Sequence, residues 1–152
     1  MEKVSIEAFK VIGISVRTSN ENGQAGQDIP QLWSRFMSEG IAAQIPNKVD
    51  DRIFSIYTNY LGDHTGPYDT ILGCEVSSLD EIPEGMIGQS FEGGLHAKFI
   101  SKGDLTQGAV YGTWAEIWQT ELNRTYTADF EVYGEKAADP TNGEVDIFVA
   151  IR

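Results

Sequence analysis

A four-residue pattern that favours extended structure occurs twice in the chain. Residues Phe54–Tyr57 and Phe130–Tyr133 both have the form Phe-x-(Ile/Val)-Tyr, with 76 positions between equivalent residues. Each copy is typical of a β-strand because Phe, Ile, Val and Tyr all favour strands. A helical pattern precedes each copy, over residues 29–43 and 105–122, at nearly the same offset. Because the strand pattern and the helical pattern recur together, the sequence predicts two strand-helix-strand-strand units related by a pseudo-twofold axis.

The remaining elements follow from alternating apolar residues and from turn residues. Asp28 and Pro30 predict the start of the first helix, after a polar loop over residues 19–28. The predicted fold class is α+β, an antiparallel sheet with both helices packed against it and a ligand groove between the units. We expect one domain over residues 1–152, duplicated roughly as 1–80 and 81–152. Strands are expected at residues 5–18, 52–60, 68–76, 86–90, 95–102, 127–135 and 144–151.

Charge and composition exclude several classes of function. The formal net charge of −12 disfavours nucleic acid as a partner, because binding to phosphates requires basic patches. The charged start of the chain and the absence of a long apolar run argue against a signal peptide or a membrane span, so we expect a cytoplasmic protein with no membrane partner. Cys74 is the only cysteine, which excludes an intrachain disulfide. We expect no metal and no cofactor.

One carboxylate breaks the symmetry of the repeat. Glu131 lies in an otherwise apolar strand, where Glu131 and Tyr133 project to one face and Phe130 and Val132 to the other. Burying a charge is costly unless it is paired. The first copy has Ser55 at the position of Glu131, so the acid is not a general requirement of the strand. We therefore expect Glu131 to anchor a single charged group of a ligand.

Several segments resemble the GyrI-like family, the effector-binding domain of AraC-type and MerR-type multidrug regulators. The family also occurs alone, including as cationic drug-binding proteins encoded by integron cassettes. The resemblance covers essentially the whole chain, and the order of the segments is its most specific part. It rests on Phe9–Ile14, Ile29–Phe36, Tyr68–Val76, Phe130–Tyr133 and Asp146–Ile151.

The resemblance implies a duplicated α+β fold with a deep apolar groove. It also implies that Glu131 lies at the bottom of this groove and binds amphipathic cations. Aromatic side chains would form the walls, since aromatic faces attract cations. We expect Glu75 to add negative charge. Trp33 and Trp118 are expected to be core residues, and His64 and His96 to be structural or surface residues. The predicted wall residues are Tyr57, Tyr133, Trp114 and Phe148.

Three functions remain open from the sequence. The first is a non-catalytic binder of amphipathic cationic aromatic compounds, without a DNA-binding domain of its own. The second is a hydrolase of electrophilic small molecules with Glu131 as the general base, aided by Tyr57 or Tyr133, although no nucleophile, triad or metal motif is present. The third is an interaction module that resembles a gyrase inhibitor, with a protein partner or as a homodimer.

Overall fold

The computed structural model describes all 152 residues and contains one eight-stranded antiparallel sheet with three helices and four short 3₁₀ turns. The helices are α1 (Ala25–Ser38), α2 (Ile41–Gln44) and α3 (Ala109–Gln119). None of them is both long and apolar enough to cross a membrane. The strands are β1 (Glu2–Ile6), β2 (Phe9–Thr18), β3 (Ile53–Thr58), β4 (Tyr68–Val76), β5 (Ile87–Phe91), β6 (Gly94–Gly103), β7 (Ala128–Tyr133) and β8 (Gly143–Ala150).

The order of the strands confirms the predicted α+β fold with two related units. The sheet runs β1-β6-β8-β7-β3-β4-β2-β5. Strands β1–β4 belong to the first unit and β5–β8 to the second, in the same sequence. If each strand is replaced by its equivalent in the other unit, the same order is obtained in reverse. Each unit also has a leading strand that pairs with the other unit, β1 with β6 and β5 with β2. The strand expected over residues 5–18 is therefore two strands, separated at Glu7 and Ala8.

The pseudo-twofold axis passes between Ser55 and Glu131. These two residues are directly paired across β3 and β7, and Ile53 pairs with Tyr133 while Tyr57 pairs with Asp129. A shift of 76 positions converts Tyr57 to Tyr133 and Asp129 to Ile53, so the pair Tyr57–Asp129 becomes the pair Tyr133–Ile53, as a twofold axis requires. Glu131 therefore lies at the centre of the sheet, where the two units meet.

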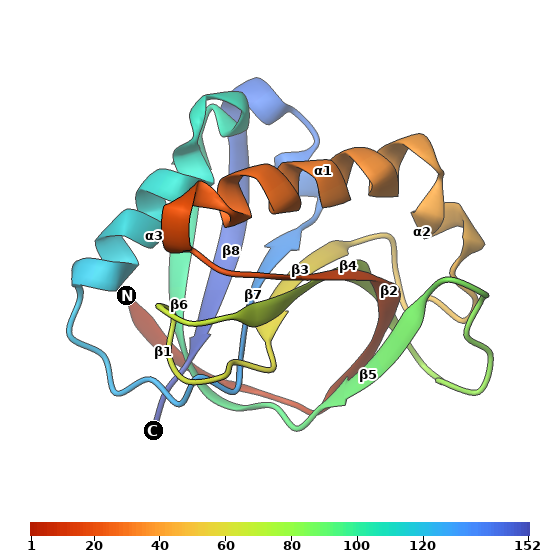
Figure 1. Cartoon of the computed structure of the whole chain (residues 1–152), viewed down its shortest axis with the longest axis horizontal. Coiled ribbons are helices and arrows are strands. Elements are labelled where there is room, and N and C mark those ends of the chain that lie inside the picture. Colours follow the sequence, from red (N-terminus) through yellow and green to blue (C-terminus); the bar gives the residue numbers. More distant parts are fainter.

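The two long helices cover the outer parts of the same face of the sheet. Leu32 and Phe36 of α1 are buried in a core with apolar side chains of β2 and β4. Ile117 of α3 is buried in a second core against β8. Figure 1 shows α1 and α3 lying over different parts of the strongly curved sheet. The middle of β3 and β7 lies between these two cores.

The central strands carry two polar residues between the two apolar cores, as a row of paired residues across the sheet shows. Leu72 of β4 pairs with Ser55, Ser55 with Glu131, and Glu131 with Ile147 of β8. Leu72 lies in the core under α1 and Ile147 in the core under α3. The two central positions between them are polar, because neither helix contributes an apolar core at the axis.

The other face of the sheet has its own core. Val11, Ile56, Ile71 and Val132 are buried there with a group of phenylalanines that stack on one another. This core explains the apolar character of both faces of the central strands. The buried phenylalanines are Phe54, Phe91 and Phe130, and the partly buried Phe9 and Phe148 pack against them.

The helix boundaries differ from those expected. Helix α1 begins at Ala25, so Asp28 is not its N-cap and Pro30 lies inside the helix. It ends before Gly40, whose φ of 60° breaks the helix and permits the short α2 to start. Helix α3 begins only after Gly108, whose φ is 80°, and most of the first turn expected over residues 105–108 is 3₁₀.

Strands β2 and β4 approach each other closely at a pair of glycines. Gly13 lies directly opposite Gly73. A Cβ atom at either position would overlap a main-chain carbonyl group, that of Leu72 or that of Ile12. Glycine is required here because the backbones leave no room for a side chain.

Candidate functional site

The Glu131 side chain is buried and accepts three hydrogen bonds from neutral donors. Only 2% of the residue is exposed. Its Oε2 atom accepts from the Tyr57 hydroxyl at 2.7 Å and from Trp114 Nε1 at 2.7 Å. Its Oε1 atom accepts from the Tyr133 hydroxyl at 2.6 Å. No lysine, arginine or histidine forms an ion pair with Glu131, so the protein binds this carboxylate without neutralising it.

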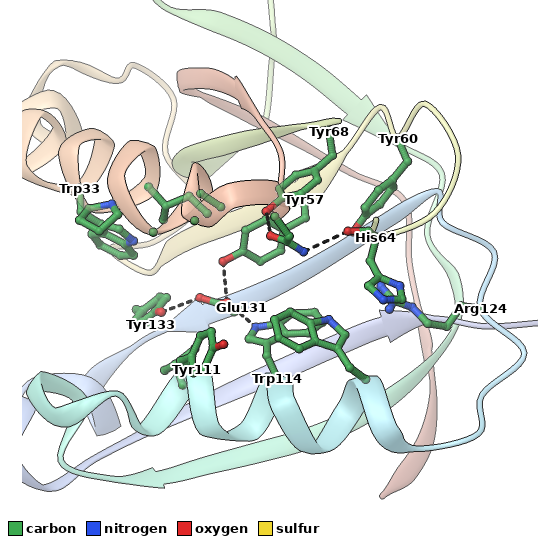
Figure 2. A pocket seen from close by; sticks show the side chains of 18 residues that line it. Trp33, Tyr57, Tyr60, His64, Tyr68, Tyr111, Trp114, Arg124, Glu131 and Tyr133 are labelled. Carbon is green, nitrogen blue, oxygen red and sulfur yellow. Dashed lines mark hydrogen bonds between the residues drawn. The ribbon is translucent and has the colours of Figure 1, made fainter. Parts of the chain in front are cut away.

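The two tyrosines are equivalent in the two units, and they approach the carboxylate from opposite sides of the axis. Tyr57 packs edge-on against Trp114 of α3, with ring centroids 5.6 Å apart. Tyr133 packs edge-on against Trp33 of α1, with ring centroids 4.9 Å apart. A symmetric set of two tyrosines and two tryptophans therefore surrounds a single acid, Glu131, as Figure 2 shows.

Burial dominates the electrostatics of this group. Loss of solvent raises the pKa of Glu131 above its ordinary value, against the opposing effect of the three hydrogen bonds. Burial, followed by the nearby charge of Glu131, raises the pKa of Tyr57 and Tyr133 well above the ordinary tyrosine value. The same two causes raise the pKa of Tyr68 to about 12. All three tyrosines are hydroxyl donors at neutral pH.

Glu131 lines a cavity of about 570 Å³ between α1 and α3. Cavities of roughly 300–1,000 Å³ are typical of small-molecule sites. Eleven of its 18 lining residues are hydrophobic. The walls are mainly aromatic, with Ile29, Pro30 and Val110 adding aliphatic surface. The aromatic lining residues are Trp33, Tyr57, Tyr60, Tyr68, Tyr111, Trp114, Trp118 and Tyr133.

The structure brings together four of the six predicted site residues, Glu131, Tyr133, Tyr57 and Trp114, and places two elsewhere. Phe148 pairs with Phe130 across β7 and β8 and stacks on it at 4.9 Å. Alternate residues of a strand point to opposite faces, so Phe148 points away from Glu131.

Glu75 is also placed away from the cavity. In β4 it alternates with Leu72 and Cys74, which belong to the core under α1. Its carboxylate forms an ion pair with Arg52 at 3.3 Å. The assignment of extra negative charge in the groove to Glu75 is therefore corrected, because the strand period directs this side chain to the opposite face.

Several lining residues were expected to be structural or were not identified. Trp33 and Trp118 have the spacing of core residues on their helices, yet both line the cavity. His64 stacks on Trp118 with centroids 6.1 Å apart. Trp33 packs on Tyr133 as Trp114 packs on Tyr57, but the two tryptophans are not 76 positions apart, so the repeat in the sequence does not identify Trp33. Tyr60 and His64 lie at or beyond the end of β3, where a local pattern gives no orientation.

A second buried acid, Asp129, does not line the cavity but bonds two residues that do, Tyr60 and Arg124. Asp129 is fully buried, and its Oδ2 accepts from the Tyr60 hydroxyl at 2.6 Å and from Arg124 Nη2 at 2.7 Å. Its Oδ1 accepts from the Ala150 backbone N–H at 2.8 Å. Unlike Glu131, Asp129 has a cationic partner within the protein. The two acids share a face of β7 but differ in the partners that the protein provides.

Comparison with known proteins gives matches along nearly the whole chain. The Cass2 model, described as integron-associated effector binding protein, matches residues 4–151. The putative transcriptional regulator protein YobU of Bacillus subtilis (strain 168) is 31% identical over 151 residues, with 97% of this chain and 94% of YobU covered.

Solved structures agree with this assignment. An integron cassette protein from the mobile metagenome of Vibrio cholerae is 29% identical, with a TM-score of 0.75 over 99% of this chain and 95% of that one. SAV2435 bound to tetraphenylphosphonium has a TM-score of 0.81 at 18% identity, covers 99% of this chain and 93% of its own, and shows the shared fold. The predicted resemblance is confirmed, and the chain belongs to the family of integron-associated effector-binding proteins.

Proposed function

We propose that this protein binds amphipathic, aromatic cations in the cavity between α1 and α3, with Glu131 as the charge partner. The observation that carries the proposal is a buried carboxylate that has three neutral hydrogen-bond donors and no protein cation. A ligand cation supplies the missing charge. The aromatic walls supply apolar area and cation–π attraction.

The carboxylate is prepared for a cation before the ligand arrives. Glu131 is already removed from water, so binding adds little to the cost of desolvating it. The hydroxyls of Tyr57 and Tyr133 hold the carboxylate in position, but they carry no charge and leave its attraction for a cation in place. Aromatic walls with one acid impose few directional demands, which favours a range of related ligands.

The relatives support an effector-binding role. The family description names effector binding, and SAV2435, which shares the fold, has been solved with the cation tetraphenylphosphonium. YobU is named as a putative transcriptional regulator. For this chain we propose the role of a cation sensor or buffer.

The test uses two ligands that differ in charge and share one ring system. N-methylacridinium is a permanent cation, whereas acridine is neutral at pH 8. Binding of each is followed by fluorescence titration to the wild-type protein and to Glu131→Gln, which keeps the shape of the side chain. Loss of one buried charge contact of about 2 kcal/mol weakens binding of the cation roughly thirtyfold. Binding of acridine is expected to change less than about threefold.

Glu75→Gln is the matched control, because it removes the same charge from the opposite face of the sheet. It is expected to leave binding of N-methylacridinium unchanged. An equal loss of affinity for the cation and for acridine in Glu131→Gln would show that Glu131 shapes the cavity without acting as its charge partner.

Hydrolysis is a second candidate, and one feature of Glu131 favours it. Its pKa is raised by burial, towards the range useful to a general base. Oε2 accepts two hydrogen bonds and Oε1 only one, so Oε1 keeps the capacity to accept a hydrogen bond from a water molecule. Turnover of a panel of strained electrophiles by the wild-type protein, abolished in Glu131→Gln, would establish this activity. Binding without any turnover would exclude it for that panel.

A further inference from the structure

Arg124 places hydrogen-bond donors at the end of the cavity beyond Glu131. Its side chain lines the cavity and is only 7% exposed. The guanidinium makes one hydrogen bond within the protein, from Nη2 to Asp129 Oδ2. Its Nε atom is buried and has no acceptor. Figure 2 shows Arg124 beside His64, at the end of the cavity formed by Tyr60.

The incomplete bonding of Arg124 has an energetic consequence. A guanidinium has five N–H donors, and a buried donor without an acceptor is unfavourable by about 1–3 kcal/mol. Asp129 uses only part of this capacity, since its other contacts are with Tyr60 and the Ala150 backbone. Nε is sealed off from the cavity, so an oxygen atom of a ligand in this part of the cavity would bond Nη1, which has no acceptor in the protein. Arginine suits a carboxylate because its planar fork matches both oxygens.

The protein holds Arg124 in place through strained local structure. Its backbone forms an isolated β-bridge with Ile151 near the chain terminus. The Tyr126 ring lies against the guanidinium at 4.4 Å, and Tyr126 itself has a φ of 55°. Positive φ is unfavourable for a bulky residue and is retained where the surroundings over-determine it. The ring of Tyr126 also stacks on His64, which lines the same end of the cavity.

We infer that Arg124 forms a subsite for a ligand carboxylate, so that the preferred ligands are zwitterionic aromatic compounds. This inference rests on the proposed binding of a cation at Glu131. Asp129 and Glu131 are two residues apart on one face of β7, a separation of about 7 Å. The ligand therefore carries its positive centre and its carboxylate about 7 Å or more apart, joined by a rigid aromatic frame that lies along the cavity walls.

The test compares a phenyl aminoxanthylium dye with its carboxyphenyl analogue, the corresponding rhodamine free acid. The two dyes share the cationic ring system and differ in one carboxylate. Their dissociation constants are measured by fluorescence anisotropy at pH 8. The wild-type protein is expected to bind the carboxylate dye about tenfold more tightly, the effect of one charge-assisted contact. If the wild-type protein binds both dyes equally, or prefers the dye without the carboxylate, this measurement by itself overturns the inference.

Variants assign the preference to Arg124. Removing Arg124 alone would leave Asp129 buried and unpaired, so Arg124→Gln is combined with Asp129→Asn. The double variant is expected to bind both dyes equally. The matched control is Arg17→Gln with Asp69→Asn, which removes an exposed ion pair of the same type. A carboxylate preference that persists in the Arg124 variant with native circular dichroism would contradict the inference.

Glu131→Gln separates this inference from the proposed function. Both dyes carry the xanthylium charge, so this change is expected to weaken both by the same factor. If it weakens neither dye, the proposed charge role of Glu131 fails, while the ratio of the two wild-type affinities still decides the role of Arg124. If the ratio is close to one and Glu131→Gln weakens both dyes, only the Arg124 subsite fails.

Discussion

The symmetric pair of tyrosines permits a direct measurement of how the protein holds its buried charge. Tyr57→Phe and Tyr133→Phe each remove one hydroxyl from Glu131 and leave the ring in place. The lost contacts are 2.7 Å and 2.6 Å long and come from equivalent positions of the two units. Each variant leaves the carboxylate with two of its three donors.

The expected cost follows from the burial of Glu131. A hydrogen bond to a charged group contributes about 1.5–3 kcal/mol, so we expect the free energy of unfolding to fall by about 2 kcal/mol in each variant. For a chain of this size, 1 kcal/mol lowers Tm by about 2–4 °C, which gives a fall of about 4–8 °C. The cost is expected to grow as the pH rises through the folded-state pKa of Glu131, because the ionised carboxylate accepts stronger bonds than the neutral acid.

Urea unfolding of the ligand-free protein at several pH values between 5 and 9 measures these costs. Tyr111→Phe is the control, since Tyr111 lines the same cavity, is 69% exposed and makes no hydrogen bond with Glu131. A cost below about 0.5 kcal/mol in both variants, no larger than in Tyr111→Phe, would refute the role of the hydroxyls. A cost that falls as the pH rises would contradict the charge-assisted character of the bonds.

Two further predictions concern the buried acid and the sheet. Burial raises the folded-state pKa of Glu131 above its unfolded value, so its contribution to stability is present at low pH and is lost as the pH rises through the folded pKa. Relative to wild type, Glu131→Gln should therefore gain unfolding free energy from pH 5 to pH 8 in urea titrations, and a constant difference would contradict this. Gly73→Ala should lower the unfolding free energy by about 2 kcal/mol or more, because its Cβ would overlap the Ile12 carbonyl group. An unchanged urea midpoint would show that the two backbones separate easily.

Much of the architecture can be predicted from the sequence, because the strand and helix patterns occur in two copies. The pattern shared by Phe54–Tyr57 and Phe130–Tyr133 predicts two equivalent strands, and the structure pairs them across the pseudo-twofold axis. Strand period alone places Glu131 and Tyr133 on one face and Phe130 on the other. The exchange of β1 and β5 between the units has no local signal, because it depends on which strand edges remain free after the units pair.

Helix boundaries were harder to predict than helix positions. Asp28 and Pro30 form a suitable start for a helix, yet α1 begins at Ala25. Its first turn lies along the cavity, where Ala25 and Gly26 are lining residues. Packing at this end of the helix therefore prevails over the local capping preference.

The sequence by itself determined the duplicated strands, the presence of a single acid on one of them and the family to which the chain belongs. Only the tertiary structure decided which aromatic residues surround that acid. Phe148 lies on the far face because the register of β7 and β8 sets it opposite Phe130, whereas Trp33 enters the cavity through the placement of α1. Arg124 reaches the same cavity from a connecting segment. Register and the placement of segments depend on contacts between residues far apart in the chain, and a local pattern does not contain them.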